Sequence, residues 1–70
     1  MLDLDRNEAL ILIAKTAFSP FTKADYVSFA GVESETPYIA ETDDYIIILD
    51  GNMVQFMNAE GDFKSFFLGE

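Results

Sequence analysis

Apolar residues recur at helical spacing near the start of the chain. The stripe contains Leu10, Ile13, Ala14 and Ala17, and Ile11, Leu12 and Phe18 widen it. Upstream, Asp5 and Glu8 have the spacing of a capping box, in which the first side chain accepts from first-turn amides and the second reaches back. The pattern predicts a helix over residues 5–17 that is buried around much of its circumference.

A second helical pattern follows directly. Ser19 can cap a helix whose first position is Pro20, and Gly31 can end it in a left-handed conformation. The apolar residues between them are Phe21, Ala24, Val27, Phe29 and Ala30. We expect a helix over residues 20–30. The alternative is a strand over residues 26–30, because Tyr26 and its neighbours favour strands.

Residues 31–44 contain five acids and are expected to be mostly loop. Pro37 biases the residue before it towards extended backbone. Residues 38–40 fit either a short edge strand or an apolar plug.

From Tyr45 onward the pattern becomes that of strands, over residues 45–49, 53–57 and 63–68. Asp50-Gly51 is a strong hairpin signal, and Asn58 to Gly61 fits a type I turn followed by a left-handed glycine. The expected pairs are Leu49 with Asn52, Ile47 with Val54, Met57 with Phe63, and Val54 with Phe66. The C-terminal half is therefore predicted to be a three-stranded antiparallel meander.

Alternation along these strands sorts their side chains onto two faces. The first face holds Tyr45, Ile47, Leu49, Val54, Phe56, Phe66 and Leu68, with Lys64 at its rim. The second face holds Ile46, Ile48, Met53, Met57, Phe63 and Phe67, diluted by Gln55 and Ser65. Both faces are apolar, although an antiparallel sheet normally shows one polar face to water. Something should therefore cover the second face.

The expected fold is a single α+β domain over residues 1–70. Two N-terminal helices pack on one face of a C-terminal three-stranded antiparallel β-meander, in the order α-α-β-β-β. The expected core contains Leu10, Ile13, Ala17, Phe21, Val27, Ile47, Leu49, Val54, Phe56 and Phe66.

Charge and composition exclude several classes of function. Thirteen acids against four bases give a net charge of −9, and residues 24–70 hold all of it. This balance argues against direct binding of nucleic acid or of an anionic membrane. The chain has no Cys and no His, which excludes disulfides, thiolate zinc sites and histidine-dependent nucleophiles. We find no targeting signal and no apolar run of membrane-spanning length, so we expect a cytoplasmic location.

Candidate chemistry is sparse, and we expect no catalytic residue, no cofactor and no metal. Paired carboxylates such as Asp43 and Asp44 lie in polar segments, where nothing raises the pKa of a carboxyl as a general acid requires. Asp43, Asp44 and Asp50, or Asp50, Asn52 and Asp62, could converge on calcium, but neither stretch has the spacing of an EF-hand loop. Turn chemistry accounts for them better.

Two functions fit these observations. The first is a non-catalytic protein–protein interaction module, expected to be a homodimer, whose partner is another protein or a second copy of the chain. The apolar contact residues are then Ile46, Ile48, Met53, Met57, Phe63 and Phe67.

The second is a nucleic-acid mimic of the phage or mobile-element type. Such a protein inhibits a DNA- or RNA-binding host enzyme through an acidic surface that occupies the enzyme's positive groove. The acidic candidates are Glu33, Glu35, Glu41, Asp43, Asp44, Asp50 and Asp62. The alternative explanation of the charge is that it keeps a small hydrophobic protein in solution.

The charge imbalance generates the first prediction. Self-repulsion among the acids of residues 24–70 should lower stability at neutral pH, and salt screens it. We expect the melting temperature to rise as sodium chloride increases from none to about 0.5 M. A steady fall over this range would instead mean that a few strong ion pairs dominate the electrostatics.

Overall fold

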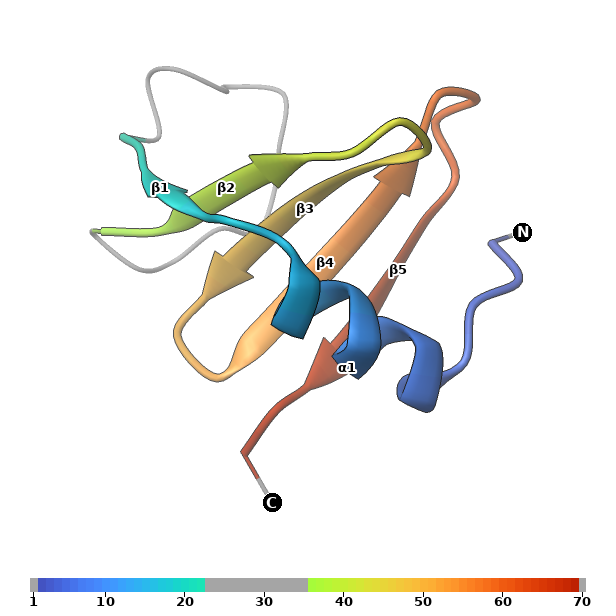
Figure 1. Ribbon diagram of the computed structural model, residues 1–70, viewed down its shortest axis with the longest axis horizontal. Coiled ribbons are helices and arrows are strands. Elements are labelled where there is room, and N and C mark those ends of the chain that lie inside the picture. The colour runs from blue at the N-terminus through green and yellow to red at the C-terminus, as the bar shows by residue number, and fades with distance from the viewer. Residues whose placement is uncertain (1, 23–35, 70) are drawn as a thin grey trace.

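Within the described residues, five antiparallel strands form one sheet in chain order, and one helix lies across one face (Figure 1). The computed structural model describes residues 2–22 and 36–69. Its elements are α1 (Arg6–Lys15), β1 (Ser19–Pro20), β2 (Tyr38–Glu41), β3 (Tyr45–Asp50), β4 (Met53–Asn58) and β5 (Phe63–Phe67). The expected architecture of two helices on a three-stranded meander is therefore wrong, because the described chain has one short helix and five strands.

The first error lies at the start of the expected second helix. Ser19 and Pro20 do not begin a helix but form β1, which pairs antiparallel with Ile39 and Tyr38 of β2. The fixed φ of proline suits an edge strand as well as a first helical turn, so the residue does not distinguish them. The rest of that prediction, including the alternative strand over 26–30 and the cap at Gly31, lies outside the described residues.

Tyr38–Glu41 forms a strand, so of the edge strand and the apolar plug expected over residues 38–40, the strand is the one observed. It is not an edge strand, however, because β1 pairs with it on one side and β3 on the other. β1 has two residues, which is too short for a strand pattern to be recognised in the sequence.

The helix begins where its capping residue predicts. The Glu8 backbone N–H donates to Asp5 Oδ1 at 2.8 Å, and α1 ends at Lys15. Its orientation differs from the prediction. Ala9 is buried and Leu12 and Ile13 are half-buried against the sheet, whereas Leu10, Ile11, Ala14 and Ala17 are exposed. The helix is thus buried along one side only, because a continuous apolar run does not specify which side faces the core.

The turn between β3 and β4 is displaced from its expected position. Asp50 pairs with Met53, and Gly51 and Asn52 form the two-residue loop. Gly51 has a φ of 65°, so the glycine takes the first loop position that type II′ hairpins reserve for it. Each expected partner moves by two residues along β4, which leaves every side chain on its predicted face.

The second hairpin has the predicted register. Val54 pairs with Phe66 and Met57 with Phe63. The Asn58 N–H donates to the Asp62 carbonyl, and Gly61 closes the three-residue loop with a φ of 91°. β3, β4 and β5 thus run as consecutive antiparallel strands, but they belong to a five-stranded sheet and not to the predicted three-stranded one.

The core lies between α1 and the first face of the sheet. Ile47, Val54 and Phe56 have no exposed surface, and the Phe56 ring meets Tyr45 and Phe66 edge-on at centroid distances of 5.9 Å. The expected core residues Ile13, Ile47, Leu49, Val54, Phe56 and Phe66 all belong to this cluster. Leu10 and Ala17 do not, Phe21 is buried on the opposite face, and Val27 lies outside the described residues. Leu2 and Leu4, which the sequence did not single out, complete the core.

The cap at Asp5 generates a stability prediction. Asp5→Ala should lower the free energy of unfolding by about 1 kcal/mol, because an unsatisfied first-turn amide replaces the hydrogen bond. For a domain of this size, the melting temperature should fall by about 4–8 °C. Asp3→Ala is the matched control, since Asp3 is also exposed, carries the same charge and caps no helix. Equal melting temperatures for the two variants would contradict the assignment of the cap.

Candidate functional site

Four large apolar side chains lie on the second face over β4 and β5. Met53 pairs with Phe67 and Met57 pairs with Phe63, so each methionine stands opposite a phenylalanine. Both phenylalanines are 68% exposed and both methionines are half-buried. Gln55 and Ser65 form the pair between them. We call Met53, Met57, Phe63 and Phe67 the apolar strip.

The other half of the second face is closed. Phe21, which follows β1, packs against Ile48, and Ile39 and Ile46 complete this small cluster. The Phe21 N–H donates to the Pro37 carbonyl at 3.0 Å, which holds the segment in place. Ile48 has no exposed surface, so a partner has no access to it.

The six predicted apolar contact residues therefore share one face but differ in access. Four form the apolar strip, Ile46 is half-buried at its side, and Ile48 is core. Alternation places residues on a face, and it places these six correctly. It does not show that Phe21 covers part of that face, because Phe21 belongs to a segment whose pattern resembled a helix.

The five predicted acidic residues that the structure describes do not form one surface. Asp43 and Asp44 are exposed in the β2–β3 turn, and Asp62 is half-buried in the β4–β5 turn at the same end of the sheet. Glu41 projects from β2 on the second face, and Asp50 is buried at the opposite end of β3. Glu33 and Glu35 lie outside the described residues. Glu60, not among the candidates, also lies at the turn end, where it lines a cleft with Asp43 and Asp44.

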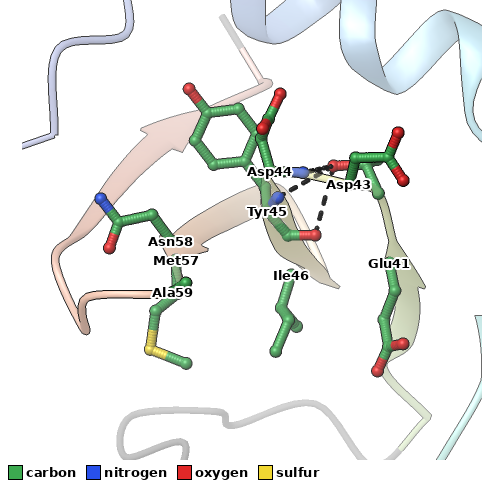
Figure 2. Close-up of a pocket in the computed structure, with 9 residues that line it drawn as sticks. Glu41, Asp43, Asp44, Tyr45, Ile46, Met57, Asn58 and Ala59 are labelled. Atoms are coloured by element: carbon green, nitrogen blue, oxygen red, sulfur yellow. Dashed lines mark hydrogen bonds between the residues drawn. The ribbon is translucent and has the colours of Figure 1, made fainter.

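A shallow cleft of about 230 Å³ lies beside these turns. Figure 2 shows Glu41, Ile46 and Met57 pointing to one side of the sheet, with Tyr45 and Asn58 on the other.

The cleft is built around a turn that Thr42 holds. Thr42 Oγ1 accepts from the backbone N–H groups of Tyr45 at 2.9 Å and Asp44 at 3.3 Å. Its backbone N–H donates to the Tyr45 carbonyl at 2.8 Å. The polar groups of the cleft thus mostly stabilise the hairpin. The carboxylates of Asp43 and Asp44 are exposed to solvent.

Across residues 2–22 and 36–69, no three acidic side chains come close enough together to hold a metal ion. The calcium sites considered from sequence are divided between the two ends of the sheet, because Asp50 lies at one end and Asp43, Asp44 and Asp62 lie at the other.

The helical content also bears on membranes. α1 is the one helix in the described ranges, and its ten residues fall well short of the length and apolar character of a membrane-spanning helix.

Comparison with protein-family models, with curated proteins and with solved structures finds no match for this chain. We therefore infer function from the geometry of the apolar strip and the charges around it.

Proposed function

We propose that the chain is a small, acidic, non-catalytic protein–protein interaction module that associates through the apolar strip. One observation carries the proposal: Phe63 and Phe67 are 68% exposed on a folded sheet, next to two half-buried methionines. A cluster of exposed apolar side chains on a folded protein often marks an interaction site. Protein–protein interfaces are also enriched in aromatic residues and methionine. Methionine adds an adaptable, polarizable contact.

The partner that fits best is a second copy, giving a homodimer. The net charge of −9 makes two copies repel, so they can meet only where charge is absent. The apolar strip and the Gln55–Ser65 pair within it carry no charge. Gln55 also has both a donor and an acceptor on its amide, so two copies related by a two-fold axis can satisfy each other.

The nucleic-acid mimic is a second candidate, favoured by Asp43, Asp44 and Glu60 around one end of the sheet. This surface would bind a basic groove, and salt would weaken that contact. Salt has the opposite effect on the homodimer, since it screens repulsion between acidic copies. The salt dependence of association thus distinguishes the two functions.

Phe67→Ala tests the proposed contact. The substitution should weaken association by about 2 kcal/mol, roughly 30-fold in Kd, because a large exposed aromatic is lost from the contact. The melting temperature of the dilute protein should change little, since the side chain is mostly exposed. Sedimentation velocity over a concentration series gives the first quantity and thermal unfolding gives the second.

Phe66→Ala is the matched control one residue away. Phe66 packs in the core on the first face, so this change should lower stability by about 3 kcal/mol. A wild-type protein that stays monomeric across the series and binds no hydrophobic dye would overturn the proposal. So would a Phe67→Ala variant whose association equals that of wild type.

A further inference from the structure

Among the described residues, the sheet has β1 at one edge and β5 at the other, and β5 is the longer. At the other edge, β1 has two residues and contains Pro20, so it offers little backbone for another strand to pair with. β5 has five residues, no proline and no acid. An edge of this kind is a ready template for unwanted pairing with another chain.

The hydrogen bonds between β4 and β5 show which backbone groups face outward. The Leu68 N–H donates to the Asn52 carbonyl, and the Asn58 N–H donates to the Asp62 carbonyl. In an antiparallel ladder bonded pairs alternate with non-bonded pairs, so Lys64 and Phe66 bond to β4. The backbone groups of Phe63, Ser65 and Phe67 therefore point away from the sheet.

Two cationic side chains join this edge to the N-terminal segment. Arg6 Nη1 donates to the Phe67 carbonyl at 2.6 Å, and Lys64 Nζ donates to the Leu4 carbonyl at 2.8 Å. Leu2 and Leu4 are buried in the core, which anchors the segment. Lys64 Nζ also lies 5.3 Å from the centroid of the Phe66 ring. We call residues 2–6 the N-terminal strap.

We propose that the N-terminal strap guards the β5 edge against pairing with a second copy of the chain, with Arg6 as the guarding residue. The guanidinium occupies the carbonyl of Phe67, an outward-facing acceptor that an incoming strand needs, and it places a charge beside the edge. A second strand must displace this charge-assisted bond before it can pair. Association is thereby confined to the face of the sheet and does not continue from edge to edge.

This inference goes beyond the proposed function, because it concerns the edge and not the apolar strip. Arg6→Ala should open the edge. Lys15→Ala is the matched control, since it removes the same charge from an exposed position of the same helix. Light scattering over a concentration series, at about 0.15 M salt so that repulsion is screened, measures the mean mass of each variant.

We expect the mean mass of Arg6→Ala to grow with concentration beyond that of wild type, and that of Lys15→Ala to follow wild type. Adding Ser65→Pro to Arg6→Ala should return the mean mass to that of Ser65→Pro alone, because proline removes an outward N–H that no β4 residue uses. Equal masses for all variants, or growth that Ser65→Pro does not reverse, would overturn the inference.

The two proposals fail separately. Phe67→Ala tests the contact through the apolar strip with Arg6 intact, and Arg6→Ala tests the edge with Phe67 intact. If Arg6→Ala melts below the assay temperature, Arg6→Met replaces it. That variant keeps a long side chain of high helix propensity and loses both the charge and the N–H donor, so the same growth is expected. Its absence in a folded Arg6→Met protein would likewise contradict the guarding role.

Discussion

Alternation of side chains along β3 and β4 is the constraint from which the rest of the structure follows. Ile47 pairs with Phe56 and Leu49 with Val54, and these residues face α1 in the core. Their burial forces the intervening residues onto the opposite face, where most are also apolar. α1 has ten residues and lies on the first face, so it cannot also cover the second.

The second face is consequently closed by smaller means and only in part. Phe21 covers Ile48, while the half over β4 and β5 keeps Phe63 and Phe67 exposed. The proposed protein–protein contact at the apolar strip would explain why large aromatics occupy positions that would otherwise suit polar residues.

Much of the C-terminal half could be predicted from the sequence. Strand alternation assigned the faces correctly even though the first turn was misplaced. The pairing of β3 with β4 shifted by two residues, and an even shift leaves each side chain on the same face. Asp5 also marked the start of α1, since a cap is a local interaction between neighbours in sequence.

The failures have physical reasons. The run from Leu10 to Ala14 is apolar at every position, so it predicts a helix but not its orientation. Ser19 and Pro20 suit a helix start and an edge strand equally, and only pairing with distant residues decides between them. Leu4 and Arg6 form hydrogen bonds with residues 60 and 61 positions away, and no local pattern reveals contacts of that kind.

Methyl NMR of labelled methionine and isoleucine tests the central claim most directly. Met53 and Met57 lie in the apolar strip, and Ile47 is fully buried on the first face. As the protein is diluted until it dissociates, the methyl signals of Met53 and Met57 should shift together, and that of Ile47 should stay constant. A Met53 signal that stays constant while the mass of the protein changes would show that association uses another surface.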